Sequence, residues 1–364
     1  MSRFPAAANV LRRAVAARAF PAAAVEVGSR EAVLWRDAVG HLTYDPQADA
    51  ASSDTIFDLA SLTKVLCTTT LAMRAADEGI LRLEDRVSAW LPDWRGKDRD
   101  EVTVADLLAH TSGLTAYLPY YRDLTGRVEF EHAIATGPLE YAPRSRAVYS
   151  DLGFILLGFI LEDARARAMD GGQAGAIDPG AFLPAQFRRL ASYLTAEPLT
   201  FNPPRAWRGR TTPTEHDAWR GRTLVGEVHD ENAWALGGAA GHAGLFGTAG
   251  AVGAFARAAL HTLNGTAVLA RPETMRAFIR RTAVPGSSRA LGWDTMLPTS
   301  SCGTLMSPTA IGHTGFTGTS LWIDWERDLY VVLLTNRVHP SRDNEAIRTV
   351  RPAFHDAIVA EVGG

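Results

Sequence analysis

The stretch Asp58–Arg74, DLASLTKVLCTTTLAMR, places a serine and a lysine three residues apart at the start of a predicted helix. Lys64 and Lys97 are the only lysines among the 37 basic residues of the chain, so a lysine at this position stands out. Residues three apart on a helix share a face. The residues after Lys64 are apolar or small for two turns, which favours a buried site. The question is what a lysine does beside Ser61 that an arginine would not.

Nucleophilic catalysis by Ser61 is one answer. A serine hydroxyl is a poor nucleophile until a base takes its proton. A lysine can take it only when neutral, and burial and the positive end of a helix both lower a lysine pKa. Arginine does not deprotonate in proteins. A helix cap at Ser61 with a surface lysine at 64 is the alternative, and the Ser-x-x-Lys spacing alone does not separate the two.

Two further short motifs bear on the same chemistry. Tyr149–Asp151 (YSD) precedes an apolar helix, where it forms either an ordinary helix cap or a tyrosine that moves a proton. Gly312–Gly315 (GHTG) precedes a predicted strand, where it forms either a turn or a backbone that approaches a ligand closely. A backbone N–H from this strand, together with that of Ser61, is suited to bind an oxyanion.

In this order and spacing, the three motifs resemble the serine β-lactamase and penicillin-binding-protein superfamily, and more closely its class C β-lactamase-like group of esterases, transesterases, D-aminopeptidases and DD-peptidases. Two longer phrases support the resemblance, LLAHTSGL at 107–114 and GEVHDENAWALGGAAGHAGLFGTA at 226–249. The likeness covers nearly the whole chain. It implies that Ser61 is acylated, Lys64 is its partner base, Tyr149 shuttles a proton, and the N–H groups of Ser61 and Phe316 bind the oxyanion.

The chain departs from the family pattern at two positions. Asp151 stands where the family usually has an asparagine, and His313 begins a His-Thr-Gly triplet where many members have Lys-Thr-Gly. Both changes remove features suited to a β-lactam, an amide donor and a cation facing a carboxylate. The expected substrate pocket comprises Asp151, His313, Thr314, Gly315, Phe316 and Trp234. Tyr117, Tyr120, Tyr121 and Trp234 are aromatic residues that either wall an acyl pocket or simply pack.

The pattern of apolar residues predicts an α/β (α+β) fold with an antiparallel sheet built from both chain ends. The predicted domains are a sheet domain (1–75 and 245–364) and an inserted, mainly helical domain (76–244). Strand-like runs lie at 22–28, 32–37 and 41–44, and a hairpin joins 319–326 to 329–336 through Arg327–Asp328. Helices are expected at 6–18, 61–78, 103–110, 151–167, 179–194 and 343–362, the last beginning from an Asp/Asn cap, and 198–240 reads as irregular.

Bulk properties exclude several functions. A net charge of −3 gives no electrostatic basis for binding nucleic acid. Cys67 and Cys302 make no disulfide framework, and the ten histidines show no metal-ligand spacing. No cofactor is expected, since neither a phosphate-binding loop nor a G-x-S-x-G elbow occurs. The pattern predicts no membrane span and no signal peptide, so the cytoplasm is the expected compartment unless an export signal has been trimmed.

The leading interpretation is a serine hydrolase of carboxylesterase type that forms an acyl-enzyme at Ser61, with acyl transfer as a variant of the same chemistry. A β-lactamase, DD-peptidase or D-aminopeptidase is the alternative, and a non-catalytic binding protein is the alternative of another class. The expected partner is a small ester, amide or lactam, and the sequence does not determine the oligomeric state. His110 and His242 are expected to be structural, through hydrogen bonds to loop backbone.

Overall fold

The computed structural model describes residues 3–169, 180 and 182–363. Its centre is a six-stranded antiparallel sheet in the order β2-β1-β11-β10-β9-β8. The strands are β1 (Ala22–Gly28), β2 (Val33–Gly40), β8 (Asp294–Thr295), β9 (Ile311–Thr314), β10 (Ser320–Asp324) and β11 (Leu329–Thr335). The two ends of the chain meet in this sheet, because β1 pairs with β11 and places Ala24 opposite Leu334. The predicted fold class is therefore confirmed.

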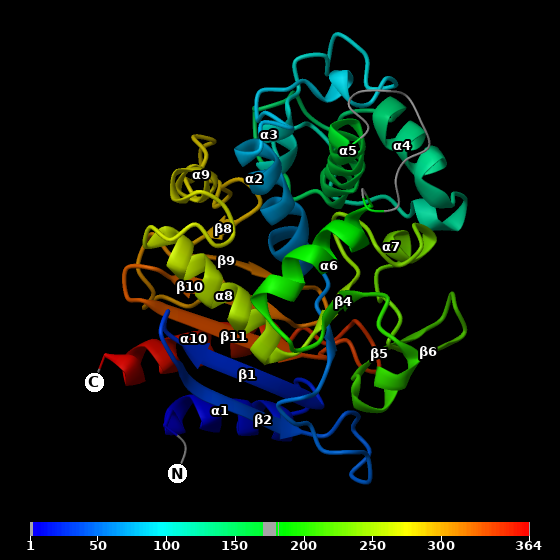
Figure 1. Cartoon of the computed structure of the whole chain (residues 1–364). Coiled ribbons are helices and arrows are strands. Elements are labelled where there is room, and N and C mark those ends of the chain that lie inside the picture. Colours follow the sequence, from blue (N-terminus) through cyan, green and yellow to red (C-terminus); the bar gives the residue numbers. More distant parts are fainter. Residues whose placement is uncertain (1–2, 170–179, 181, 364) are drawn as a thin grey trace.

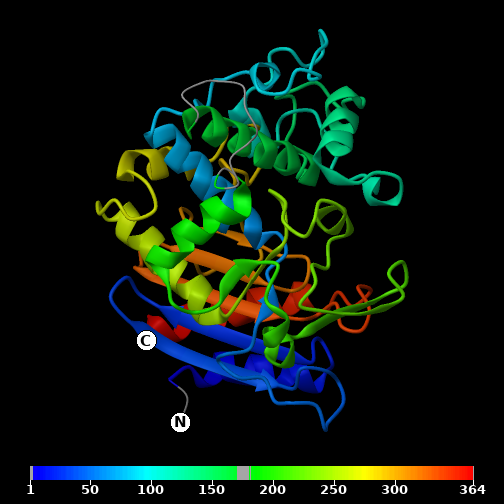
Figure 2. The same ribbon diagram turned by 45° about the vertical axis from the view of Figure 1, so that its right-hand side comes forward.

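Helices cover both faces of the sheet (Figure 1). On one face α1 (Pro5–Ala16) packs against α10 (Ile347–Val362), and on the other α8 (Ala249–Leu263) crosses β1 and β11. All seven residues of β1 are buried, and six of them are small or apolar. The seventh, Glu26, is paired with Arg36 and Arg257. The turned view in Figure 2 shows the same layering, with the remaining helices gathered beyond α8.

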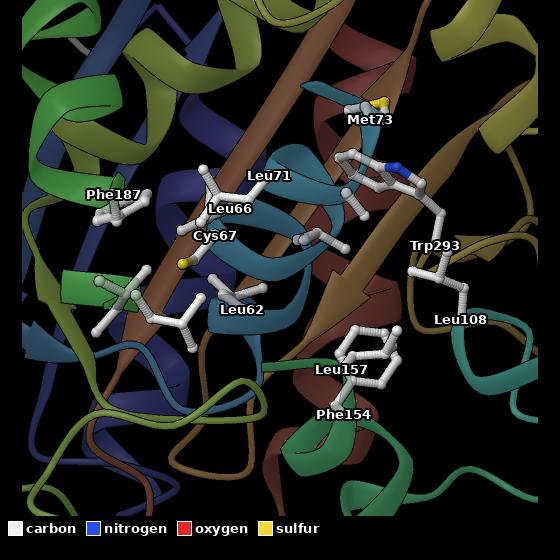
Figure 3. Packing of buried hydrophobic residues seen from close by; sticks show 14 of the residues in the cluster. Leu62, Leu66, Cys67, Leu71, Met73, Leu108, Phe154, Leu157, Phe187 and Trp293 are labelled. Carbon is white, nitrogen blue, oxygen red and sulfur yellow. The ribbon is translucent and has the colours of Figure 1, made fainter. Parts of the chain in front are cut away.

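A six-residue π-helix, Lys64–Thr69, runs into α2 (Thr70–Asp77), and the π-helix is buried along its whole length. Figure 3 shows its apolar face, where Leu66 and Cys67 lie among buried side chains that include Phe154 and Phe187. The helices around this core are α3 (Val104–Leu108), α4 (Gly126–Thr136), α5 (Asp151–Met169), α6 (Leu183–Leu194), α7 (Glu231–Ala235) and α9 (Pro272–Phe278). The site at Lys64 therefore starts from a rigid, fully packed segment.

Smaller elements lie beside the main sheet. One three-stranded sheet has the order β3-β7-β4, and a two-stranded sheet pairs β5 with β6. Their bounds are β3 (Phe57–Asp58), β4 (Leu199–Phe201), β5 (Pro213–Asp217), β6 (Arg222–Val225) and β7 (Leu245–Gly247). Short 3-10 helices occur at Val87–Ala89, Tyr120–Arg122 and Arg205–Arg210. The prediction that 198–240 is irregular was therefore wrong, because several of these elements lie within it.

The structure confirms the hairpin between β10 and β11, and Asp328 in its turn has a φ of +50°. The prediction of a strand at 41–44 was wrong, because His41 alone of these residues forms a β-bridge, an isolated one to Ala50. The final helix begins at Ile347 rather than at 343, because the Asn344 side chain accepts a hydrogen bond from the Ala346 N–H and shapes a turn before the helix.

The largest hydrophobic cluster contains residues of the sheet, such as Val332, and of the helical region, such as Leu107 and Phe154. The division into domains at 75/76 and 244/245 stays a prediction. Within 3–169, 180 and 182–363, no helix has the length and apolar character needed to cross a membrane.

Candidate active site

Ser61 lies on a tight turn between β3 and the π-helix. The carboxylate of Asp58 fixes this turn by accepting hydrogen bonds from the N–H of Ala60, at 2.8 Å, and of His229, at 2.7 Å. Ala60 has a φ of +46°, a left-handed conformation that a non-glycine residue adopts only when its surroundings impose it. The nucleophile predicted from sequence is thus presented on a backbone held from both sides.

Lys64 is fully buried directly behind Ser61. Its Nζ donates to Ser61 Oγ at 3.0 Å, to Asp151 Oδ1 at 2.6 Å and to the His242 carbonyl at 3.2 Å. An ammonium group has three donors, and three acceptors surround it here. Burial is the largest single influence and lowers the pKa of Lys64, but the Asp151 carboxylate and Tyr149 together raise the pKa above its ordinary value. The sequence indicated burial and a helix end, which lower a lysine pKa, but did not reveal the Asp151 partner; the role of Lys64 as the base stays a prediction.

Asp151 is the first residue of α5. It lines the cavity beside Ser61, but its carboxylate is engaged with Lys64. Its negative charge is therefore compensated within the protein.

Tyr149 stands over the Ser61–Lys64 pair. Lys64 Nζ lies 4.8 Å from the centre of the Tyr149 ring, and the His110 ring packs on the same tyrosine at 4.8 Å. Burial raises the pKa of Tyr149, while the charge of Lys64 and hydrogen bonds with Lys64 and Ser61 act in the opposite direction. Tyr149 is therefore a neutral phenol at pH 7, within reach of both the nucleophile and the lysine.

Two backbone N–H groups face the nucleophile without an acceptor. Within the described residues, neither the Ser61 N–H nor the Phe316 N–H forms a hydrogen bond to another protein group. The turn that carries Phe316 is joined to the β3 end by the Thr317 hydroxyl on the Asp58 carbonyl and the Thr319 hydroxyl on the Leu59 carbonyl. Two free N–H donors on turns that are hydrogen-bonded to each other, in one cavity, are suited to form an oxyanion hole.

The glycines of the GHTG motif allow close packing within the protein. A Cβ on Gly315 would lie 2.7 Å from the Leu59 carbonyl oxygen, and one on Gly312 would lie 2.3 Å from the Trp322 ring. Close packing is therefore one reason for these glycines, and the approach to a ligand inferred from sequence stays a prediction. Gly315 lets the oxyanion turn come close to the nucleophile turn.

His313 lines the cavity as a neutral group. Burial lowers its pKa well below the ordinary value, and the nearby charges of Arg289 and Lys64 lower it further. Its Nδ1 lies 2.9 Å from the Thr314 carbonyl oxygen and donates to it, so Nε2 carries no proton.

Arg289 supplies the cation that His313 does not. Its guanidinium lies over the Tyr149 ring, 4.9 Å from the ring centre, and lines the same cavity. Within the described ranges no carboxylate forms an ion pair with it. The inference that the site lacks a cation was therefore wrong. Arg289 lies in a loop with no motif around it, and no sequence signal marked it.

The cavity has a volume of about 840 Å³. Seven of the residues predicted for the site line it, namely Ser61, Tyr149, Asp151, His313, Thr314, Gly315 and Phe316. Tyr117 and Tyr121 line it as well, whereas Tyr120 and Trp234 do not. Trp234 packs edge-on against Trp219, with ring centres 5.2 Å apart, so its placement in the pocket was wrong.

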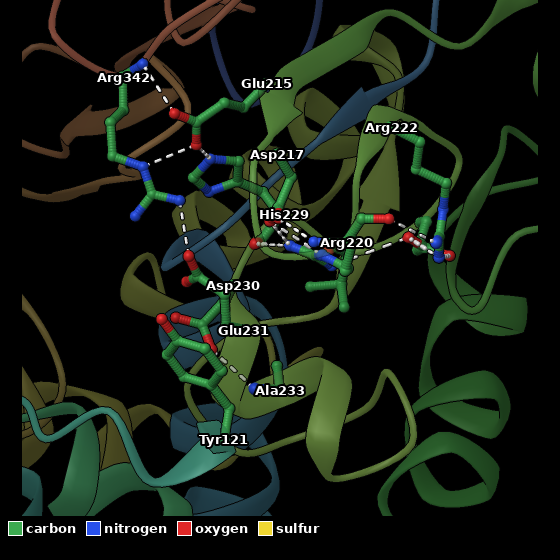
Figure 4. A network of polar contacts seen from close by, with 12 residues as sticks. Tyr121, Glu215, Asp217, Arg220, Arg222, His229, Asp230, Glu231, Ala233 and Arg342 are labelled. Carbon is green, nitrogen blue, oxygen red and sulfur yellow. Dashed lines mark hydrogen bonds and ion pairs between the residues drawn. The ribbon is translucent and has the colours of Figure 1, made fainter.

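A charged network supports one wall of this cavity (Figure 4). Arg342 binds Glu215 and Glu231, each at 2.6 Å, and Glu215 in turn contacts His229 Nε2 at 2.9 Å. The His229 ring stacks on Phe316, with ring centres 5.7 Å apart. Sequence reasoning missed this network, because its members come from three separate segments.

The two histidines expected to be structural have different partners. His110 Nδ1 accepts a hydrogen bond from the Ser150 N–H at 3.0 Å and so holds the segment before α5, as expected. His242 contacts the Asp230 carboxylate at 2.8 Å rather than loop backbone, and Asp230 in turn accepts a hydrogen bond from the Ala233 N–H at the start of α7. Through this contact the His242 carbonyl is held toward Lys64.

A serine with an adjacent lysine, a tyrosine and two free N–H donors, on this sheet with flanking helices, is the arrangement of a serine hydrolase. The sequence profile of the family described as Beta-lactamase matches residues 7–353, and the chain belongs to this family. Its curated relatives include two proteins named "Putative D-alanyl-D-alanine carboxypeptidase". The one from Salmonella agona (strain SL483) is 31% identical over 317 residues, covering 79% of this chain and 71% of the relative. The one from Escherichia coli (strain K12) is 30% identical over 318 residues, covering 79% of this chain and 70% of the relative.

Solved structures of similar fold include EstCE1, described as a hydrolase with promiscuous acyltransferase activity. It has a TM-score of 0.72 and 22% identity, and the match covers 96% of this chain and 98% of EstCE1. The unliganded simvastatin synthase LovD from Aspergillus terreus has a TM-score of 0.72 and 18% identity, with all of both chains covered. At these identities the likeness shows the fold.

Proposed function

We propose that this serine hydrolase forms an acyl-enzyme at Ser61 and cleaves short-chain carboxylic esters. The observation that carries the proposal is the Lys64 Nζ to Ser61 Oγ distance of 3.0 Å beside two unoccupied N–H donors. Together these groups activate a hydroxyl and stabilise the charge that develops on an attacked carbonyl. An ester is the simplest substrate that uses both the activated hydroxyl and the N–H donors. Tyr117 and Tyr121 line the cavity and offer an aromatic wall for its acyl group.

The proton transfers start from the charged pair of Lys64 and Asp151. For Lys64 to accept the Ser61 proton, it must first lose its own proton to solvent, against the attraction of the Asp151 carboxylate 2.6 Å from Nζ. Neutral Lys64 then takes the proton as Ser61 Oγ bonds to the carbonyl carbon. Tyr149 donates its phenolic proton to the departing alkoxide and is restored by Lys64. Hydrolysis repeats these transfers with water as the attacking group, and acyl transfer repeats them with another alcohol.

A D-alanyl-D-alanine carboxypeptidase is the second candidate, and Arg289 favours it. This guanidinium lines the cavity next to Tyr149 and has no carboxylate partner in the described part of the chain, so it is suited to a carboxylate on the leaving group. The names of the curated relatives support the same candidate. A β-lactam also bears a carboxylate, so the experiment below includes a penicillin and a cephalosporin.

Intact-mass measurement after incubation with a panel of acyl donors tests the proposal. The panel consists of p-nitrophenyl acetate and butyrate, a penicillin, a cephalosporin, and a peptide ending in D-alanyl-D-alanine. We expect an acyl adduct from the esters that maps to Ser61 by peptide mass spectrometry and is absent from Ser61→Ala. An adduct on another residue contradicts the assignment, and faster turnover of the peptide or the lactams than of the esters favours the second candidate. The cytoplasmic location stays a proposal, to be tested by cell fractionation.

A further inference from the structure

The Phe316 N–H belongs to a peptide unit whose oxygen is held by the C-terminal helix. That oxygen is the Gly315 carbonyl, and Arg351 Nη2, from α10, donates to it at 2.9 Å. The same Nη2 donates to the Thr319 carbonyl at 2.8 Å. A peptide unit is planar and trans, so its C=O and N–H point in opposite directions. Fixing the Gly315 oxygen on one side therefore fixes the direction of the Phe316 N–H on the other.

Arg351 is suited to this task by its burial and its charge. It is 8% exposed, and in the described residues no carboxylate forms an ion pair with it. Its positive charge is therefore directed at two carbonyl oxygens rather than neutralised. A hydrogen bond from a cation to a peptide oxygen polarises the peptide and strengthens its N–H as a donor. The next carbonyl, that of Phe316, is held by Arg337 Nε at 2.8 Å.

The peptide that carries the second predicted oxyanion donor is held in the same way. Its oxygen is the Ala60 carbonyl, which accepts from the Thr63 N–H at 3.0 Å and from Thr63 Oγ1 at 2.7 Å. Both free N–H groups thus belong to peptides that are anchored through their oxygens. For Ser61 the anchor is two residues further along the chain, whereas for Phe316 it is 36 residues away from the anchored carbonyl.

We propose that Arg351 is a positioning residue that aims the Phe316 N–H at the oxygen of the acyl group on Ser61. This inference rests on the proposed function, because it requires an acyl-enzyme at Ser61. A purely structural role, in which Arg351 only ties α10 to the end of the sheet, gives different results in the experiment below.

The experiment compares Arg351→Met and Arg351→Lys with the wild type. Arg327→Met is the matched control, because Arg327 does not line the cavity, pairs with Asp324 at 3.3 Å and bonds to no carbonyl of the turn. Three quantities are measured: the acylation rate and KM with p-nitrophenyl butyrate, the infrared stretching band of a ¹³C-labelled acyl carbonyl, and the melting temperature. The lysine variant keeps the charge and one donor, so it serves if the methionine variant does not fold.

We expect Arg351→Met to slow acylation by roughly 10- to 100-fold with KM changed by less than about threefold, since a displaced donor costs less than a deleted one. Weaker hydrogen bonding should move its acyl carbonyl band to higher wavenumber. Arg351→Lys should fall between Arg351→Met and the wild type, and Arg327→Met should match the wild type. An unchanged carbonyl band in both Arg351 variants, whatever their melting temperatures, overturns the inference alone. Absence of any acyl-Ser61 in the wild type overturns the proposed function as well.

Discussion

Replacing Asp151 by asparagine should shift the pH dependence of Ser61 acylation toward lower pH. The Asp151 carboxylate lies 2.6 Å from Lys64 Nζ and raises the pKa of this lysine against the effect of burial. Asparagine keeps the shape and one acceptor oxygen but removes the charge. Burial then dominates, and the pKa of Lys64 falls, so the neutral lysine that accepts the Ser61 proton is reached at lower pH.

The size of the effect follows from the geometry. An opposite charge within about 4–6 Å changes a pKa by roughly one to three units. Below the pKa, each unit changes the neutral fraction of an amine tenfold, so at pH 7 neutral Lys64 should increase by roughly 10- to 1,000-fold. A less basic amine also accepts a proton less readily. We therefore expect kcat/KM at pH 7 to rise by roughly 3- to 30-fold.

The assay is the pH profile of kcat/KM for p-nitrophenyl butyrate between pH 5 and pH 10. Asp163→Asn is the matched control, since Asp163 lies on the same helix but pairs with Arg127 at 2.6 Å, away from Ser61. Its profile should coincide with that of the wild type. If the ascending limb of Asp151→Asn stays in place or moves to higher pH, then Lys64 is not the titrating base and the reasoning fails.

Unfolding measurements on the same variant give an independent check. With the pKa of Lys64 depressed in the folded state, the unfolded chain binds more protons than the folded chain. The free energy of unfolding of Asp151→Asn should therefore rise with pH relative to the wild type. At low pH the unpaired ammonium should cost about 3–5 kcal/mol, the usual loss when one partner of a buried pair is removed.

Four further substitutions test the site. Ser61→Ala should lower kcat/KM for aryl esters by at least about 1,000-fold with an unchanged melting temperature, and retained turnover would exclude Ser61 as the nucleophile. Lys64→Arg should lower kcat/KM for aryl esters by about 100- to 10,000-fold, nearly as much as Lys64→Ala, because a permanent cation accepts no proton. An arginine variant that keeps most of its activity would show that only the charge of Lys64 is needed. Arg289→Met should lower kcat/KM by about 10- to 100-fold for a D-alanyl-D-alanine peptide but leave p-nitrophenyl acetate unaffected, and equal losses on both would contradict carboxylate binding. Gly315→Ala, whose Cβ would meet the Leu59 oxygen at 2.7 Å, should lower kcat about 100-fold in the same ester assay with KM little changed, and a wild-type rate would mean that this close approach is not needed.

The sequence by itself determined the elements whose signals are local. Ser61 and Lys64 are three residues apart on one continuous segment, so their contact follows from helical geometry whichever fold surrounds them. The hairpin of β10 and β11 follows from two apolar runs around a short polar turn, for the same reason. The resemblance of the motifs, rather than any local rule, brought Tyr149 and Phe316 to the same site.

Only the tertiary structure decided the charge state of the site and the support of its oxyanion donors. Asp151 reaches Lys64 across 87 residues, and Arg351 reaches Gly315 across 36. Arg289 approaches Tyr149 from an unmarked loop. Such contacts depend on which side chains converge when the sheet closes from both ends of the chain, and a pKa depends on burial and neighbouring charge at that point. The sequence indicated which lysine matters, whereas the fold determined that this lysine rests as an ammonium ion.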